Sequence, residues 1–561
     1  MPKTALAPAL LLGTLMFGTA PALAQQAPPA APAPTPAKPP KLIVAISVDQ
    51  FSADLFAQYR SRFTSGMARL TRGVVFPSAY QSHAATETCP GHSTILTGVR
   101  PGRNGVIANN YVDQRVTRKD TIVYCAEDET IPGTDRDHYV VSDQHLKVPT
   151  LGERMKAANP ATRVVSVAGK DRAAVMMGGH RQAIDEIWWW RDQKGDPDAR
   201  KTFTTYEGRA EPPVVTRAKR SVAAMIAQAQ PPLPLPGWCK PLDQPITAGT
   251  QIVGQGRFAR AAGNYSAFKA SPASDAAVLA LSAGLIQDMQ LGKRGATDLI
   301  AIGLSATDYI GHANGTQGTE MCIQMDQLDQ ALGGFFDVLD ETGVEYEVML
   351  TADHGAHDMT ERQQARAMPM EAHVAPALSV TDIGKAIGQD LGVAGPVLLS
   401  AESDIYVDRA LPAPVRARVL AEAQRRYRAF PQVAAALTRA EIAATAIPTT
   451  PPETWTLIER ARASYDPDRS GDLLILLKPR ITSIVTPAAG YVETHGSPWD
   501  YDRRVPLLFW RKGMVGFEQA LSVETVDIAP TLAATIGLAT PGVDGRCLDL
   551  DAGAGDTCAA R

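Results

Sequence analysis

Residues 41–48 read KLIVAISV and are followed at once by Asp49. The apolar side chains stand at consecutive positions, which is typical of a strand covered on both faces. Other short apolar runs bounded by turn residues lie at 162–169, 298–305, 346–352, 472–479 and 505–510, and helical stretches lie at 275–291, 320–341, 413–430 and 525–537. This alternation predicts an α/β fold with a mostly parallel central sheet and helices on both faces.

Two segments interrupt the alternation. Residues 180–272 are rich in Pro, Gly, Trp and charged side chains, and residues 361–490 form a long break before the last strands. We interpret both as inserted cap segments over the strand ends. The core then consists of three parts, residues 41–179, 273–360 and 491–561.

The N-terminus predicts export. Residues 1–24 contain Lys3, an apolar run and the small-x-small sequence Ala22-Leu23-Ala24, which together resemble a secretory signal peptide cleaved near Ala24. Two prolines within this run argue against a membrane anchor. Residues 25–40 form a Pro/Ala-rich spacer. No later segment is long and apolar enough to span a bilayer, so we expect a periplasmic or secreted protein with no transmembrane anchor in the mature chain.

Composition narrows the class of protein. The chain has 561 residues, 45% of them hydrophobic, and a formal net charge of −4, so binding of nucleic acid by bulk charge is not expected. Six cysteines fit an oxidising compartment, and the absence of a CxxC sequence argues against a thiolate zinc finger. Spacing does not fix the pairing: Cys547 and Cys558 are close enough in sequence for a plausible disulfide, Cys89 and Cys125 are a possible pair, and Cys239 and Cys322 have no obvious relation in the sequence. Nothing in the sequence indicates an oligomeric state.

Three aspartates and three histidines lie beside the predicted strands, where open α/β sheets bind ligands. They are Asp49, Asp308, His312, Asp353, His354 and His495. Carboxylate and imidazole groups bind zinc where no thiolate is available, and two zinc ions roughly 3.5–4 Å apart form a clamp for phosphoryl transfer. A single Asp is more often a helix cap and a single His more often a satisfied polar residue, but the joint placement predicts two Zn²⁺ ions per chain. Of the remaining histidines, His357 is the alternative ligand.

Six short motifs occur in a recognisable order. They are VDQ at 48–50, TCPGH at 88–92, TGVRPGRNGVIANN at 97–110, TDYIGH at 307–312, TADHG at 351–355 and THG at 494–496. At these residues the chain resembles the alkaline phosphatase superfamily, and specifically the threonine-nucleophile phosphatases related to nucleotide pyrophosphatase/phosphodiesterases. The resemblance covers the core and not the two insertions.

The resemblance implies that Thr88, in the pattern Thr-x-Pro-x-His, is the nucleophile, and that Thr86 lies one turn too early. It further implies two ligand sets, one of Asp49, Thr88, Asp353 and His354 and one of Asp308, His312 and His495. Zinc would lower the pKa of the threonine hydroxyl, which is a weak nucleophile by itself. Cys89 is the rival nucleophile, but the sulfatase pattern Cys-x-Pro-x-Arg is out of register by one residue. We expect His92 to support the loop.

The resemblance also implies three phosphate-binding residues. Asn109 lies where related enzymes carry an asparagine that contacts phosphate, with Asn110 as the alternative. Lys170 and Arg172 resemble the cationic pair of the monoesterase branch, although a charged surface turn would read the same. Two cations favour a monoester because its dianion carries more charge than a diester.

The reading that follows is an exported, zinc-dependent alkaline phosphatase that hydrolyses small-molecule phosphate monoesters through a phosphothreonine intermediate. The alternatives are a phosphodiesterase or nucleotide pyrophosphatase with the same two-zinc site, a sulfatase, and a non-catalytic metal-binding protein.

Overall fold

The structure is a computed structural model that describes residues 38–191, 202–366, 368–553 and 555–559. The predicted signal peptide and residues 25–37 of the predicted spacer lie outside the described residues. Across the described ranges, no helix combines the length and apolarity needed to cross a bilayer.

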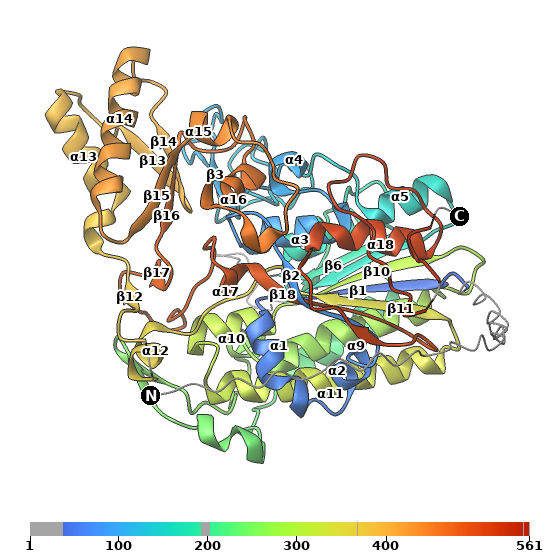
Figure 1. The fold of residues 1–561 in the computed structure, drawn as a ribbon. Coiled ribbons are helices and arrows are strands. Elements are labelled where there is room, and N and C mark those ends of the chain that lie inside the picture. Colours follow the sequence, from blue (N-terminus) through green and yellow to red (C-terminus); the bar gives the residue numbers. More distant parts are fainter. Residues whose placement is uncertain (1–37, 192–201, 367, 554, 560–561) are drawn as a thin grey trace, which may run out of the picture.

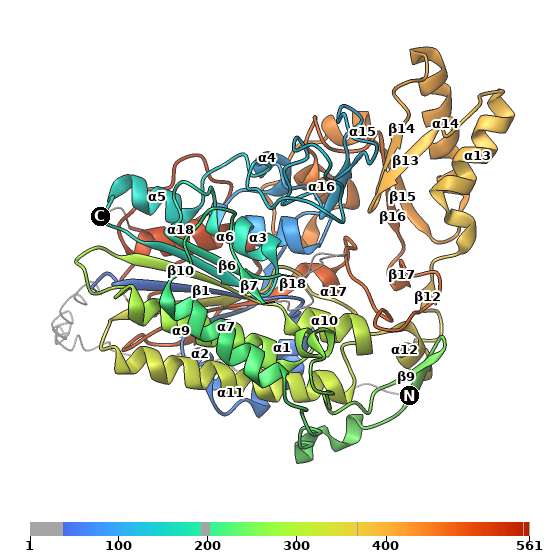
Figure 2. The same cartoon turned by 180° about the vertical axis from the view of Figure 1, so that it is seen from behind.

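The core is a mixed central sheet with helices on both faces, as predicted (Figures 1 and 2). Strand β1 lies in the middle and pairs in parallel with β10 on one side and β11 on the other. Antiparallel pairs involve only β18 and β7 in this sheet. In spatial order the path is β19 (Phe517–Glu518), β2 (Val74–Tyr80), β18 (Arg504–Arg511), β11 (Tyr346–Thr351), β1 (Leu42–Val48), β10 (Asp298–Leu304), β5 (Val164–Ala168), β6 (Glu186–Trp190) and β7 (Phe203–Thr204), and β20 (Val523–Glu524) also pairs with β2.

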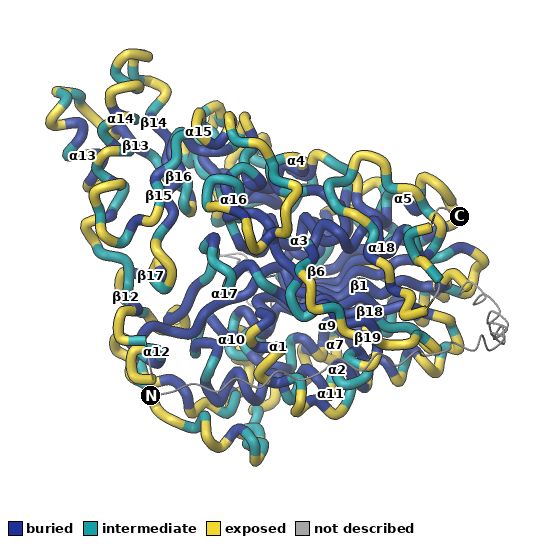
Figure 3. Tube along the Cα trace, viewed as in Figure 1, coloured by how far each residue is buried: buried dark blue, intermediate teal, exposed yellow. Residues whose placement is uncertain are grey.

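Helices cover both faces of this sheet. On the first face lie α1 (Ala53–Tyr59), α2 (Gly66–Leu70), α7 (Pro213–Ile226), α9 (Pro272–Asp288) and α11 (Thr319–Glu341). On the second lie α3 (Thr88–Thr97), α5 (Leu151–Ala158), α6 (Asp171–Gly178) and α18 (Ile528–Thr535). Every residue of β1, β5, β10 and β11 is buried, which explains why their apolar side chains are consecutive rather than alternating (Figure 3).

One predicted strand lies in a different sheet from the one we expected. The run at 472–479 forms β16 (Leu473–Leu477), which belongs to a separate antiparallel sheet of order β13-β14-β16-β15. Its odd-numbered side chains pack towards α13 (Val380–Leu391) and α14 (Ala413–Ala429), and Leu474 and Leu476 pack on α15 (Arg439–Ala443) and α16 (Leu457–Ser464). Both faces of β16 are therefore covered, which gives the same sequence pattern as a central strand.

The central sheet extends into residues 180–272, the first expected insertion. Strand β6 carries the consecutive tryptophans Trp188–Trp190, all buried, and pairs in parallel with β5. Strand β7 pairs antiparallel with β6 and forms the sheet edge. This part of the segment was missed because tryptophan next to charged residues reads as irregular structure.

The second insertion contains a lobe with its own hydrophobic core, visible at the upper left of Figure 1. Its strands β13 (Leu398–Ala401) and β14 (Asp404–Val407) approach β3 (Asn110–Val112) of the core. Val112, Ala401 and Tyr406 form a small apolar cluster there. The lobe is thereby packed against the segment that follows α3.

All six cysteines are paired. Cys89–Cys125 and Cys547–Cys558 are the two pairs that spacing suggested. The third pair, Cys239–Cys322, joins the short helix η2 (Gly237–Leu242) to α11. It could not be predicted from the sequence, because its partners lie 83 residues apart.

Candidate active site

The six predicted Asp and His ligands converge at one edge of the central sheet. Asp49 directly follows β1, and Asp353 and His354 come just after β11. Asp308 and His312 lie on α10 (Ala306–Asn314), which follows β10. Because β10, β1 and β11 are parallel neighbours, their carboxyl ends meet at this edge. His495 reaches it from the loop before α17 (Asp500–Arg503).

The ligand atoms form two overlapping groups. Asp49, Asp353 and His354 offer atoms within 4.8 Å of one another, and so do Asp308, His354 and His495. The imidazole rings of His354 and His495 stack with centroids 3.6 Å apart. His312 Nε2 lies 3.3 Å from Asp308 Oδ1, as their spacing of four on one helix predicts. His354 therefore stands between the two groups.

This set of donors fits divalent cations. Asp49 Oδ1 and His354 Nε2 lie 3.5 Å apart, and neither of these buried atoms has a hydrogen-bond partner among the described residues. Leaving such groups buried and unpaired is costly unless a ligand satisfies them. Carboxylate oxygen and imidazole nitrogen are the donors that zinc accepts.

The pKa values of the site aspartates are shifted because several carboxyl groups and a few cations lie close together in one buried space. Burial raises the pKa of Asp49 well above its usual value, and repulsion from Asp308 and Asp353 adds to the rise. Burial also opposes ionisation of Asp308, but the charges of Lys170 and His312 outweigh it and hold its pKa well below the usual range. The cluster thus requires positive charge.

Lys170 supplies part of that charge. Its Nζ lies 2.6 Å from Asp49 Oδ2 and 2.6 Å from Asp308 Oδ2. The sequence predicts this side chain at the substrate phosphate beside Arg172, and the structure places it between two of the predicted metal ligands. The reason is electrostatic, because a buried lysine is most stable between carboxylates.

Thr88 is the first residue of α3, and its surroundings distinguish it from its neighbours. Arg172 Nη2 approaches its Oγ1 at 3.5 Å. The hydroxyl of Thr86 instead donates to the carbonyl of Ser497 at 2.7 Å. The sulfur of Cys89 is bonded to Cys125 and is not a free thiolate. Among the three candidate nucleophiles, only Thr88 faces the cationic group.

His92 supports the start of α3, as expected. Its Nδ1 lies 2.9 Å from the carbonyl oxygen of Thr88 and 3.1 Å from Asp353 Oδ2. His92 thus links the start of α3 to one of the predicted metal ligands.

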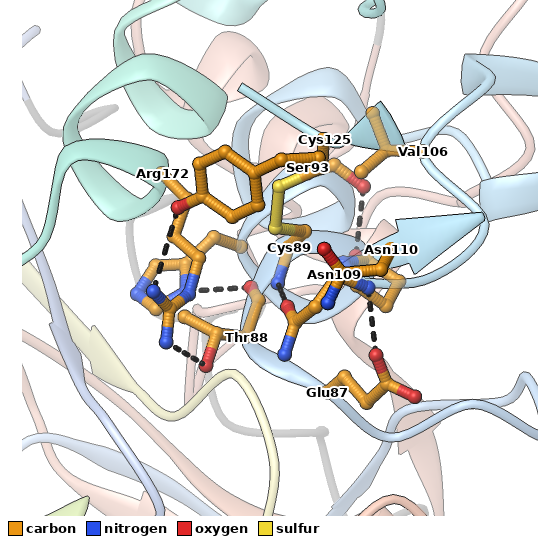
Figure 4. The surroundings of a disulfide bond; sticks show 12 residues. Glu87, Thr88, Cys89, Ser93, Val106, Asn109, Asn110, Cys125 and Arg172 are labelled. Carbon is orange, nitrogen blue, oxygen red and sulfur yellow. Dashed lines mark hydrogen bonds between the residues drawn. A yellow bond between two sulfur atoms is a disulfide. The ribbon is translucent and has the colours of Figure 1, made fainter. Parts of the chain in front are cut away.

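The two asparagines point in different directions (Figure 4). The Asn109 side-chain oxygen accepts a hydrogen bond from the Cys89 backbone N–H at 2.9 Å, so this amide lies at the start of α3. The Asn110 amide donates to Glu402 Oε1 at 2.8 Å and lies on the side of the lobe. Geometry therefore favours Asn109 over Asn110 as the residue nearest Thr88.

Thr88, Asn109, Arg172 and His495 line one cavity of about 410 Å³. Its opposite wall comes from the lobe and includes Glu402, Ser403 and residues 475–477. His357 also lines the cavity, but its Nε2 lies 3.1 Å from Thr482 Oγ1 and 3.2 Å from Glu371 Oε1, away from both ligand groups.

Two buried residues that contact the predicted metal ligands were not predicted from the sequence. The Gln50 backbone N–H donates to Asp353 Oδ1 at 3.1 Å, and its amide donates to Asp308 Oδ1 at 3.3 Å and to Glu493 Oε2 at 3.2 Å. The carbonyl of Glu493 lies 2.8 Å from His312 Nδ1. The one available signal was that each residue neighbours a predicted ligand or motif.

Comparison with known proteins places the chain in a family. Residues 43–498 match the type I phosphodiesterase/nucleotide pyrophosphatase family. Alkaline phosphatase PhoK from Sphingomonas sp. is 57% identical over 532 residues, which cover 94% of each chain. Alkaline phosphatase PhoD from Zymomonas mobilis is 47% identical over 525 residues, 92% of this chain and 89% of that one. A crystal structure of wild-type alkaline phosphatase PafA has the same fold, with a TM-score of 0.79 at 24% identity, covering 91% of this chain and 99% of that one. The chain is therefore an enzyme of the type I phosphodiesterase/nucleotide pyrophosphatase family, within the alkaline phosphatase superfamily.

Proposed function

We propose that this enzyme is an exported, zinc-dependent alkaline phosphatase that hydrolyses small-molecule phosphate monoesters through a phosphothreonine at Thr88. One observation carries the proposal. The Thr88 hydroxyl, the Arg172 guanidinium, His312 and His495 line one cavity, and Asp49, Asp308, Asp353 and His354 converge beside these histidines at the carboxyl edge of the sheet. The names of the relatives that are 57% and 47% identical support the same activity.

The chain's own residues would act in two steps. Thr88 Oγ1 forms a bond to phosphorus while the bond from phosphorus to the ester oxygen breaks and the alcohol leaves. Water then attacks the same phosphorus, the bond to Oγ1 breaks, and inorganic phosphate leaves with the threonine hydroxyl restored. Lys170, Arg172 and the Asn109 amide would hold the non-bridging oxygens during both steps.

The metal ligands would be divided as the resemblance implies. Asp49, Thr88, Asp353 and His354 would hold one zinc ion, and Asp308, His312 and His495 the other. When bound, the two cations supply the charge that lowers the pKa of the threonine hydroxyl and of water and that stabilises the leaving oxygen. The unpartnered Asp49 Oδ1 and His354 Nε2 support this assignment.

Of the alternative activities, phosphodiesterase is better supported than sulfatase. A phosphodiesterase or nucleotide pyrophosphatase would use the same donors, and the family match keeps it as the second candidate. A sulfatase would need a free cysteine at position 89, which is in a disulfide.

Three disulfides support an oxidising compartment, and we propose a periplasmic or secreted location.

The deciding experiment compares kcat/KM for phenyl phosphate and for diphenyl phosphate on zinc-loaded enzyme. We expect a strong preference for the monoester. Arg172→Ala should lower kcat/KM for the monoester more than for the diester, because it removes a cation near the dianion. Arg72→Ala, at an exposed site, is the matched control. A preference for the diester, or equal losses in Arg172→Ala, would favour the second candidate.

A further inference from the structure

Glu402 lies in the turn between β13 and β14 with a backbone φ of +50°. A side chain larger than glycine or asparagine is uncommon in this left-handed region and persists only where its surroundings hold it. The side chain is exposed, and Glu402 lines the cavity that also contains Thr88, Asn109 and Arg172. The turn therefore presents a carboxylate from the lobe to the proposed phosphate site.

The position of this carboxylate is fixed relative to the nucleophile. The amide of Asn110 donates to Glu402 Oε1 at 2.8 Å, although the two residues are 292 positions apart. Behind the turn, Ala401 and Tyr406 pack against Val112 of β3. Strand β3 pairs with β4 (Ile122–Tyr124), and the next residue, Cys125, is bonded to Cys89 at the start of α3. A continuous path of contacts thus joins Glu402 to the residue that follows Thr88, and Figure 4 shows its last part, the Cys89–Cys125 disulfide beside Asn110.

The cavity wall has a different character at each end. Arg172, Asn109 and His495 surround Thr88, and this end would hold the phosphate. On the lobe side the cavity is bounded by Ser403, by residues 475–477 of β16 and by Thr482 and Ser483, and Tyr491 continues the wall from the core side. Glu402 is the charged side chain that the lobe adds to this wall, within the described residues. We place the alcohol of a bound monoester on this side, because the cavity that Thr88 lines continues from the phosphate end to the lobe.

We propose that Glu402 determines specificity for the alcohol part of the substrate: it favours monoesters of cationic alcohols over neutral ones and disfavours alcohols that carry a second anionic group. This inference rests on the proposed function. Two charges about 6–8 Å apart in partly hydrated surroundings interact strongly enough to change a rate about 3- to 10-fold. Salt should weaken the preference, because the carboxylate is exposed.

The test measures kcat/KM on 2-aminoethyl, propyl and 2-carboxyethyl phosphate, which differ mainly in the charge of the alcohol. The variants are Glu402→Gln, Glu402→Lys and the control Glu341→Gln, which removes an equal charge at the exposed end of α11. Glutamine keeps an oxygen for the Asn110 amide. Each variant's rates are expressed as the ratio of aminoethyl to carboxyethyl ester, and comparing this ratio with that of the wild type cancels the difference in leaving-group chemistry.

We expect the wild-type ratio to fall about 10- to 100-fold in Glu402→Gln, because the attraction of the cation and the repulsion of the anion, about 3- to 10-fold each, multiply in it; it should fall further in Glu402→Lys and stay unchanged in Glu341→Gln. The wild-type ratio should also approach that of Glu402→Gln at high ionic strength. A ratio that is the same in wild type and in both Glu402 variants overturns the inference and leaves the proposed function intact. Failure of the zinc-loaded wild type to hydrolyse any of the three monoesters overturns the proposed function itself.

Discussion

Thr88 differs from Thr86 in what its hydroxyl touches. Arg172 approaches the Thr88 hydroxyl, whereas the Thr86 hydroxyl is bonded to the carbonyl of Ser497. We predict that Thr88→Ala lowers kcat for phenyl phosphate by about 10³-fold or more, because the attacking oxygen is lost. Thr88→Ser should keep measurable turnover. Thr86→Ala should cost only about the free energy of one hydrogen bond, about 1 kcal/mol, in stability.

Steady-state rates together with zinc content check this prediction. Zinc analysis shows whether the site is still assembled in each variant. Turnover by Thr88→Ala close to the wild-type level would move the nucleophile elsewhere.

Glu347 is a second residue with a measurable consequence, far from the site at the start of β11. Burial raises its pKa to about 7, although the charge of Arg511 lowers it in part. The folded state therefore holds a proton on Glu347 that the unfolded chain loses above its ordinary pKa of 4.5. Stability should fall as pH rises between 4.5 and about 7, because the native state binds more protons in this window.

We predict that Glu347→Gln stabilises the protein at pH 8 by about 1–3 kcal/mol relative to its effect at pH 5. Urea unfolding at the two pH values measures the difference. Glu345→Gln, at an exposed position two residues earlier, should show no such dependence on pH. An equal effect of Glu347→Gln at both pH values would mean that Glu347 is charged in the fold at pH 5 as well.

The residues of the site could be predicted to different degrees. Asp49, Asp308, Asp353 and their histidine partners were accessible because each lies beside an apolar strand whose end can be placed. Glu402 was not, since its contact with Asn110 spans 292 positions and its turn carries no motif. The charge of Lys170 predicted a place at the phosphate, which stays a prediction; its contacts with Asp49 and Asp308 could not be predicted, because they depend on distant strands meeting at one edge.

At the scale of elements, apolar runs predicted strands well and their sheets less well. β1, β5, β10, β11 and β18 are central strands, as expected. β16 has the same pattern but packs between two helical layers of the lobe, because burial on both faces does not specify the sheet. β6 was missed since aromatic residues dominate it, although they are buried in the core like any apolar run.

The disulfide Cys89–Cys125 joins α3 to the residue after the hairpin of β3 and β4. Cys89–Cys125 closes a loop of 36 residues that carries Asn109. We predict that the double variant Cys89→Ser, Cys125→Ser loses about 2–4 kcal/mol of stability and raises KM for phenyl phosphate, because Asn109 is held less firmly. The matched control is Cys547→Ser, Cys558→Ser, which opens a loop far from the cavity.

Thermal unfolding and Michaelis–Menten kinetics on both double variants separate the two effects. An equal rise in KM in the control would show that the effect is general destabilisation and not the position of Asn109.

At the scale of the whole molecule, residues of the central sheet core and of the lobe together line the cavity. The sheet core contributes the nucleophile and the donors, and the lobe contributes the opposite wall. The order of motifs along the chain predicted the first half of this arrangement. A cap from residues 361–490 was expected over the strand ends, but its packing on β3 was not, because this contact between distant apolar residues carries no sequence signal.

The central claim is that the phosphoryl group is transferred first to the hydroxyl oxygen of Thr88 and then to water. The most direct measurement mixes zinc-loaded enzyme with excess phenyl phosphate, quenches with acid within the first turnovers and maps phosphorylation by peptide mass spectrometry. The account predicts phosphate on Thr88 in the wild type and none in Thr88→Ala. Phosphate on another residue, or steady turnover with no phosphorylated protein in rapid-quench samples at any time, would contradict it.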